Sequence, residues 1–167
     1  SGSIWASAAW QGVIERGARG GAVHFLGLCS DGNVHSHLDH LQALVEAAVR
    51  GGCHKIYLHA LLDGRDVAPT SALTYVDRLE TICMHARAYT STTDARIVSG
   101  GGRMAITMDR YEADWPMVER GWNTHVHNLG RRFGSCREAV ETLRGEHPGI
   151  IDQDLPAFVV GPETPMR

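Results

Sequence analysis

The chain lacks the features that would place it at a membrane or on nucleic acid. No apolar run in its 167 residues is long enough for a membrane-spanning helix, and no charged start followed by an apolar core marks a signal peptide. Positive charge is not in excess, because 16 Lys and Arg residues face 19 Asp and Glu residues, for a net charge of −3. Nucleic-acid and membrane-surface binding usually need a basic stripe. We therefore expect a cytoplasmic protein that binds neither nucleic acid nor membranes.

Closely spaced cysteine pairs are also absent. Cys29, Cys53, Cys83 and Cys136 are far apart and include no Cys-x-x-Cys pair, which argues against a zinc knuckle and against a dithiol redox site. In apolar surroundings a free thiol packs as a small hydrophobic side chain. We therefore expect a reducing environment. Hydrophobic residues make up 43% of the chain, which at this length suffices for the core of one domain covering residues 1–167.

Apolar runs alternate along the chain with segments of helical periodicity. Residues 23–28, 55–62 and 96–99 are predicted strands, and residues 38–50 are a predicted helix that ends at two glycines. A short apolar run at residues 157–160 is assigned to an edge strand. The alternation of strand and helix predicts an α/β domain of three layers, with a mainly parallel central sheet and helices on both faces.

Hydroxyl side chains mark two further helix starts. Thr70 or Ser71 is placed to cap the helix that follows the second strand. Ser135 is followed three residues later by Glu138, which is the spacing of a capping box. We therefore expect one helix to begin just after residue 71 and another just after residue 135.

A polar loop follows each of the three predicted strands. The loops are LCSDGNVHSHL at residues 28–38, LLDGRD at residues 61–66 and SGGGRM at residues 99–104. In a parallel sheet the carboxyl ends of the strands lie along one edge, where α/β domains usually bind their ligands. The sequence therefore predicts that the three loops converge on one binding site.

The side chains of these loops indicate an anionic ligand. Arg65, Arg103 and Arg110 carry planar guanidinium groups, which grip carboxylate or phosphate through two parallel hydrogen bonds. Gly100–Gly102 would let the backbone approach an anion and offer its N–H groups. The predicted ligand is small and multiply anionic. A non-enzymatic module that binds such an anion is one interpretation of this pattern.

A histidine cluster in the first loop supports a second interpretation. His35, His37, Asp39 and His40 have the H-x-H-x-D-H spacing of the metallo-β-lactamase-type hydrolases, which bind two zinc ions with these side chains. The cluster runs into the predicted helix that starts at Leu38, however, so we interpret His37 and His40 as residues of the helix start. A dinuclear zinc hydrolase that uses this HSHLDH segment remains the alternative.

The same loops carry a resemblance to a known family. SDGNVHSH, then HALLDGRD, then GGRMAITMDRYEADW resemble, in order and spacing, the motifs of the cofactor-independent (2,3-bisphosphoglycerate-independent) phosphoglycerate mutases. The similarity extends weakly over nearly all of the chain. Two departures are visible: Asn33 stands where the family usually has Gly, and Ala68 stands where Pro is common.

The resemblance implies an enzyme of glycolysis and gluconeogenesis. Members of the family interconvert 3-phosphoglycerate and 2-phosphoglycerate through a phosphoserine intermediate. Their alkaline-phosphatase-like domain holds the nucleophilic serine and two divalent ions, usually Mn²⁺, with Mg²⁺ or Co²⁺ as alternatives. A second domain, inserted into the first, grips and reorients the glycerate. This chain resembles the inserted domain alone, so we expect a monomeric fragment that binds no metal and is inactive without the phosphatase-like domain in cis.

The resemblance also assigns roles to individual residues. Five side chains correspond to substrate-binding positions of the family: His35, Arg65, Asp66, Arg103 and Arg110. The three arginines would pair with the phosphate and carboxylate of the substrate. His35 and Asp66 would bond its hydroxyl and phosphate oxygens. No catalytic nucleophile is expected in this chain, and Asp109 is expected to orient a neighbouring arginine.

Overall fold

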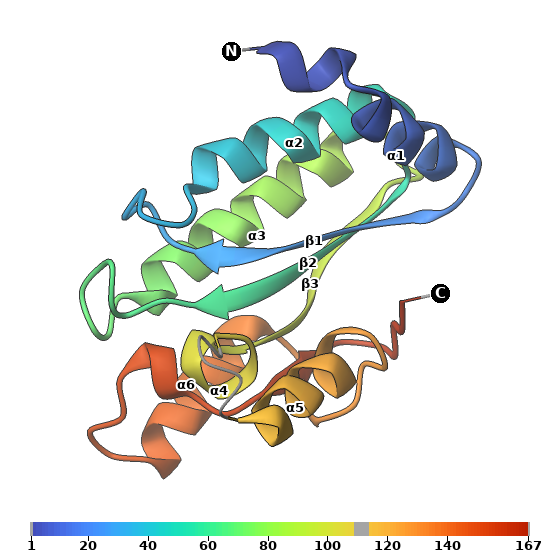
Figure 1. Ribbon diagram of the computed structural model, residues 1–167. Coiled ribbons are helices and arrows are strands. Elements are labelled where there is room, and N and C mark those ends of the chain that lie inside the picture. Colours follow the sequence, from blue (N-terminus) through green and yellow to red (C-terminus); the bar gives the residue numbers. More distant parts are fainter. Residues whose placement is uncertain (1, 109–113, 167) are drawn as a thin grey trace.

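The computed structural model describes residues 2–108 and 114–166. Its elements follow the alternation that the sequence predicts (Figure 1). In chain order they are η1 (Gly2–Ala6), α1 (Ala8–Ala18), β1 (Ala22–Cys29), α2 (Leu38–Arg50), β2 (Lys55–Leu62), α3 (Ala72–Tyr89), β3 (Asp94–Gly102), α4 (Arg103–Ile106), α5 (Trp115–His125), β4 (Arg131–Phe133), α6 (Cys136–Glu146), η2 (Asp152–Asp154) and β5 (Phe158–Val160).

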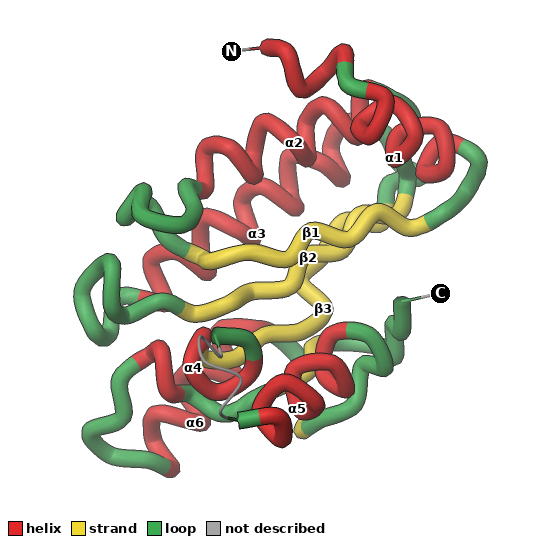
Figure 2. Tube along the Cα trace, in the orientation of Figure 1, coloured by secondary structure: helices red, strands yellow, loops and turns green. Residues whose placement is uncertain are grey.

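The strands form one five-stranded sheet in the order β1-β2-β3-β5-β4. The pairs β1–β2, β2–β3 and β4–β5 are parallel, and β3 pairs with β5 in the antiparallel sense. Strands β1 and β2 are long and lie next to each other, as the tube in Figure 2 shows. The predicted fold class is therefore correct. The final apolar run is not an edge strand, because β5 lies between β3 and β4.

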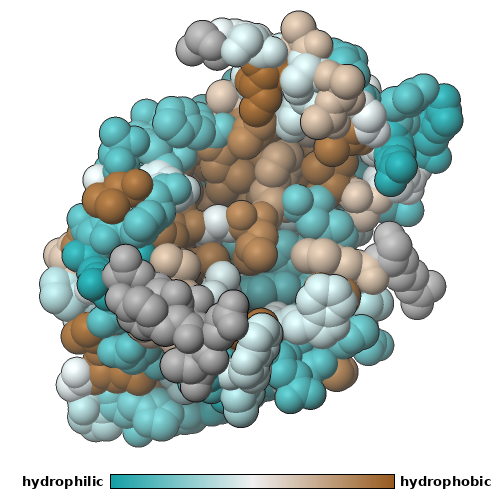
Figure 3. Space-filling model, in the orientation of Figure 1, coloured by the Kyte–Doolittle hydropathy of each residue, from teal (hydrophilic) through white to brown (hydrophobic). Residues whose placement is uncertain are grey.

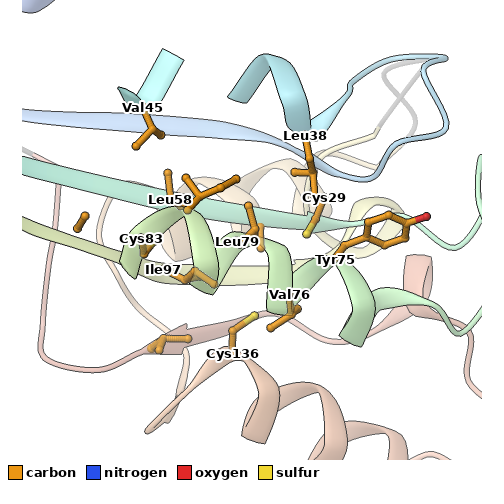
Figure 4. Packing of buried hydrophobic residues seen from close by; sticks show 14 of the residues in the cluster. Cys29, Leu38, Val45, Leu58, Tyr75, Val76, Leu79, Cys83, Ile97 and Cys136 are labelled. Atoms are coloured by element: carbon orange, nitrogen blue, oxygen red, sulfur yellow. The ribbon is translucent and has the colours of Figure 1, made fainter. Parts of the chain in front are cut away.

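Helices cover the two faces of the sheet unequally. One large core joins the sheet to α2, α3 and α6, with Leu38, Val45, Leu79 and Cys136 among its fully covered side chains (Figure 4). The other face carries α4 and α5, where Leu28, Leu61 and Ile106 form a much smaller cluster. The four cysteines are free thiols in the interior, and burial raises the pKa of each of them. They pack as hydrophobic side chains, as expected.

The predicted helix starts are confirmed, although one of them is capped from elsewhere. Ser135 Oγ accepts the backbone N–H of Glu138 at 3.1 Å, and the Glu138 carboxylate accepts the N–H of Gly134 at 2.8 Å. Ser71 occupies the N-cap position of α3, but the acceptor for the first helical N–H is the buried carboxylate of Asp152, at 2.7 Å. A side chain eighty positions away along the chain thus does what the local serine was expected to do.

The third strand is longer than predicted and takes up the glycines assigned to a loop. β3 runs from Asp94 to Gly102, so these glycines lie inside the sheet. The N–H of Gly102 donates to Leu155 O at 2.8 Å. A Cβ on Gly102 would collide with the backbone carbonyl of Gln153, and one on Gly100 would collide with the Phe158 ring. The prediction that Gly100–Gly102 offer their N–H groups to an anion is therefore wrong, because close packing explains why glycine is needed there.

A chain of buried polar side chains crosses the α5 face of the sheet. A shift of register in β3 places Ser99 opposite His59. His24 Nδ1 lies 2.9 Å from His59 Nε2, His59 Nδ1 lies 2.6 Å from Ser99 Oγ, and Ser99 Oγ lies 2.8 Å from His125 Nδ1. Burial lowers the pKa of His59 to about 3, with help from His125 and His24, and lowers that of His125 to about 4. Both rings are therefore neutral at pH 7.

These two histidines should make the fold sensitive to acid. Their folded pKa values lie below the ordinary 6.5, so their neutral forms stabilise the fold fully above pH 6.5, and this stabilisation is lost as the pH falls toward 4 and then 3. The expected loss at pH 5 is about 2 kcal/mol for each histidine. His125→Gln should flatten the dependence of the urea midpoint on pH between 7 and 5. The exposed control His85→Gln should leave that dependence unchanged, and equal slopes for both variants would contradict the assignment.

Candidate functional site

The segments that follow β1, β2 and β3 begin at one edge of the sheet, as the sequence predicts, although the third is the start of α4 and not a loop. Cys29 pairs with Leu62 and Leu62 with Gly102, so the three strands end level with one another. The loops after β1 and β2 project from the same end of the molecule, at the left of Figure 1, and α4 follows the end of β3 directly. Two of the loops are in close contact: a Cβ on Gly32 would lie 2.9 Å from the Asp66 side chain. The edge is therefore a packed assembly of loops.

Asp63 organises this edge. The carboxylate is 1% exposed, and its Oδ1 accepts the backbone N–H groups of Arg65 at 3.2 Å and Asp66 at 3.1 Å. The same oxygen accepts Arg103 Nη1 at 2.8 Å. Burial raises the pKa of Asp63, but hydrogen bonds from Ser30, the two backbone groups and Arg103 outweigh it and lower the pKa below the ordinary value. Asp63 is thus a buried anion that holds the loop after β2 in one conformation.

Arg103 joins the loop after β2 to the end of β3. The residue is 2% exposed, and its Nη1 group lies 2.8 Å from Asp63 Oδ1 and 2.8 Å from Asp66 Oδ2. Arginine is almost never buried to this extent unless its charge is paired. The two carboxylates and one guanidinium sum to a charge of −1, so the positive charge of Arg103 is shared with both aspartates. It fixes the position of Asp66.

Of the predicted cations that the structure describes, Arg65 remains available. Its side chain is exposed, and the guanidinium forms no ion pair or hydrogen bond with the part of the chain that the structure describes. It is adjacent in sequence to Asp66, whose backbone and side chain are both fixed. His35 is exposed in the loop after β1, which rests against Asp66 through Gly32. A cation, an imidazole and a carboxylate therefore share this edge.

A second set of contacts holds the loop after β1 against α3. Tyr75 donates its hydroxyl hydrogen to Asp31 Oδ1 at 2.7 Å, and Arg78 Nη2 pairs with Asp39 at 2.6 Å. Burial and the Asp31 carboxylate raise the pKa of Tyr75 to about 12, so its hydroxyl stays protonated. Asn33 has φ 56°, a left-handed conformation that Asn tolerates better than most residues. The replacement of the family's usual glycine therefore fits the backbone of this loop.

The histidine cluster is part of the start of a helix. His37 is the N-cap of α2, and its Nδ1 accepts the N–H of Asp39 at 3.2 Å. Asp39 and His40 lie in the first turn of α2, with the Asp39 carboxylate engaged by Arg78. Across the described residues, no group of three or more His, Cys, Asp or Glu side chains is placed to hold a metal ion. The arrangement matches the interpretation of His37 and His40 as residues of the helix start.

Two residues named from the sequence lie outside the part that the structure describes. Arg110, predicted to bind substrate, and Asp109, predicted to orient an arginine, both fall in the 109–113 gap. Their assignments therefore remain predictions. The geometry of the site is defined by His35, Arg65, Asp66 and Arg103.

Comparison with known proteins gives the same family as the motifs. Residues 1–166 match the family described as "BPG-independent PGAM N-terminus". The chain belongs to this family. A probable 2,3-bisphosphoglycerate-independent phosphoglycerate mutase of Leptospira interrogans is 56% identical over 161 residues, which are 96% of this chain and 29% of that protein. The 2,3-bisphosphoglycerate-independent phosphoglycerate mutase of Trypanosoma brucei is 46% identical over 141 residues, which are 84% of this chain and 25% of that protein.

A solved structure agrees with the fold. In crystal structures of Leishmania mexicana phosphoglycerate mutase at low cobalt concentration, one chain superimposes with a TM-score of 0.93 at 40% identity and covers 99% of this chain. The matched part is 30% of that protein. The chain thus spans less than a third of the length of the relatives it matches. Membership of this family does not favour the zinc-hydrolase alternative.

Three features of the site were not predicted from the sequence. The sequence motif assigns no role of its own to Asp63, although an Asp followed by Gly, with two backbone N–H groups just beyond, is the pattern of an Asx turn. Tyr75 and Arg78 were assigned only to a helix. Nothing in the local sequence indicates that they reach the loop after β1, because α3 begins more than thirty positions later.

Removal of the Asp63 charge should destabilise the fold more than removal of the Asp66 charge. Asp63→Asn leaves the buried Arg103 with one carboxylate and weakens the acceptor for the backbone N–H groups of Arg65 and Asp66. The change should lower the free energy of unfolding by about 3 kcal/mol. Asp66→Asn removes a partner whose side chain is 11% exposed and should cost less. Urea unfolding followed by far-UV circular dichroism measures both. Equal losses would show that Asp63 does not have the organising role described above.

Proposed function

We propose that this chain is the substrate-gripping domain of a 2,3-bisphosphoglycerate-independent phosphoglycerate mutase, an isomerase that interconverts 3-phosphoglycerate and 2-phosphoglycerate through a phosphoserine. The observation that carries the proposal is the exposed Arg65, which has no ion-pair partner among the described residues, beside the fixed Asp66–Arg103 pair, on the edge that also presents His35. The family of the chain supports the same reaction. We further propose that the protein is cytoplasmic and monomeric.

The proposed role of the domain is to bind and orient the substrate. Arg65 would grip the phosphate or the carboxylate through two parallel hydrogen bonds. His35 and the free oxygen of Asp66 would hydrogen-bond the hydroxyl group and the phosphate oxygens. Arg103 would hold Asp66 and contact substrate through N–H groups other than the Nη1 group already shared by the two aspartates. Phosphoryl transfer depends mainly on positioning and charge neutralisation, which these side chains can supply.

The nucleophile and the metal ions are proposed to come from the phosphatase-like domain in cis. Asp63 Oδ1 is already bonded to Arg103 and to two backbone N–H groups, Asp66 Oδ2 is bonded to Arg103, and the described residues provide no three-ligand cluster. The residues of this chain therefore do not fit the two divalent ions, for which we propose Mn²⁺, with Mg²⁺ or Co²⁺ as alternatives. Closure of the two domains would bring the gripped glycerate to the serine.

A module that only binds a small anion is the second candidate. It rests on the same exposed Arg65 and describes what the isolated chain can do on its own. The two candidates differ in selectivity. A mutase domain should prefer 3-phosphoglycerate to inorganic phosphate at equal ionic strength, because the substrate presents a carboxylate and a hydroxyl as well as a phosphate.

Binding of 3-phosphoglycerate should depend on Arg65. Arg65→Ala removes a charge-assisted bidentate contact and should raise Kd by about tenfold or more. The control Arg19→Ala removes an exposed arginine at the C-cap of α1, where it pairs with Glu15 far from the carboxyl ends of the strands, and should leave Kd unchanged. Isothermal titration at constant ionic strength measures both. An equal loss for the two variants would indicate general attraction of anions and no defined site.

The isolated chain should not interconvert phosphoglycerates. It should bind substrate but show no turnover with or without Mn²⁺, because the proposed nucleophile lies in another domain. The full-length protein should be active, with a serine nucleophile encoded before this segment and an Asp- and His-rich metal-binding segment after it. A coupled enolase assay on both proteins provides the test. Turnover by the 167-residue chain alone would contradict the proposal that the nucleophile lies in another domain.

A further inference from the structure

We propose that the groove between β1 and α5 is the docking site for the stretch of polypeptide that follows residue 167 in the full-length protein. This inference rests on the proposed function, in which the chain is one domain of a longer mutase. The groove has a volume of about 280 Å³ and lies on the less covered face of the sheet. Its lining is mostly apolar and includes Leu26, Ile106, Val118, Trp122 and Met166.

Large apolar side chains of this groove reach the surface. Leu26 on β1 is 50% exposed, and Trp122 and Val118 on α5 are 59% and 36% exposed. Figure 3 shows apolar residues at the surface of this side of the molecule, over the middle of the sheet. Single exposed hydrophobic residues are common, but a group of them that lines one concavity usually marks an interaction site. The groove is therefore a candidate interface.

Two polar atoms in the groove point to an occupant that brings a hydrogen-bonding group. His125 Nε2 and Thr107 Oγ1 are covered from solvent, and neither has a hydrogen-bond partner among the described residues. A buried polar atom that stays unpaired destabilises the structure. His125 is 5% exposed and lies at the end of the buried polar chain through Ser99.

The polar chain fixes what His125 offers. Ser99 has one hydroxyl hydrogen, so it donates to one neighbouring ring and accepts from the other. If it donates to His125 Nδ1, then His125 Nε2 carries a hydrogen and donates into the groove. If it donates to His59, then His125 Nε2 is an acceptor. In both arrangements one unused hydrogen-bonding atom faces the groove, and a backbone group of a docked segment matches either form because it has both a donor and an acceptor.

The path of the chain identifies the occupant. The last described residue, Met166, lines the groove and donates its N–H to Val126 O at 2.8 Å. The direct continuation of the polypeptide therefore starts at the groove. The relatives that match the chain are more than three times as long, since the matched part is 29% of the Leptospira protein. A covalently connected segment that starts at the groove has a high effective concentration there, unlike a separate partner.

Thiol labelling tests the proposal in both forms of the protein. The four native cysteines are buried and provide a slow background. Leu26→Cys and, independently, Trp122→Cys should react with a small neutral maleimide at the rate of an exposed thiol in the 167-residue chain. Both should react about tenfold or more slowly in the full-length protein. The control Met84→Cys lies on α3, on the opposite side of the sheet, where Met84 is 52% exposed, and should react equally fast in both forms.

Each other outcome overturns the inference. Equal rates for Leu26→Cys in the two forms would show that the groove stays open. Protection of Met84→Cys to the same extent would show that the covering is not specific to this groove. Protection in the 167-residue chain that grows with protein concentration would identify a second copy as the occupant. Mutase activity of the full-length protein is measured in the same preparations, so failure of the groove inference in an active enzyme is distinct from failure of the proposed function.

Discussion

The burial of Arg103 between two aspartates is the interaction on which the site depends. A guanidinium that is 2% exposed needs compensating charge, and the structure supplies it from the loop after β2. The pairing ties the end of β3 to that loop, and Asp63 then uses the same oxygen to hold the backbone N–H groups of residues 65 and 66. The exposed side chain of Arg65 therefore projects from a backbone that is fixed on both sides, which reduces the entropy lost when a ligand is bound.

The elements of the fold could be predicted because their patterns are local. The apolar run of β2 and the amphipathic stripe of α2 are correct to the residue. The extent of β3 could not be predicted, because three glycines favour a turn locally and only the approach of Phe158 and Gln153 shows why a strand needs them. The same limit applies to Ser71, whose capping role is taken by Asp152, and to β5, whose inner position depends on pairing with β3.

The site could be predicted in composition but not in its distribution of charge. The order of the loops and the type of their residues placed Arg65, Asp66 and Arg103 on one edge, as found. The sequence predicts the same role for both arginines. In the structure, however, Arg65 is exposed and Arg103 is buried with two carboxylates. The burial of Arg103 depends on Asp63, on the adjacent ends of β2 and β3, and on the packing of η2 against α4 and β3. None of these has a local sequence signal. The buried polar chain was missed as well, although His59 in the middle of an apolar strand was its one visible sign.

The unequal faces of the sheet fit the proposed role of this chain as one domain of a longer protein. The face covered by α2, α3 and α6 holds most of the hydrophobic core, so it can keep the loops at the carboxyl edge rigid without help. The other face has a small apolar cluster and a chain of polar side chains that ends at His125 Nε2, an atom with no hydrogen-bond partner among the described residues. A domain with both faces of its sheet fully covered would leave no apolar groove for another part of the protein to bind. One that leaves the β1–α5 groove open can be anchored to a larger protein while its binding edge stays free to close over a substrate.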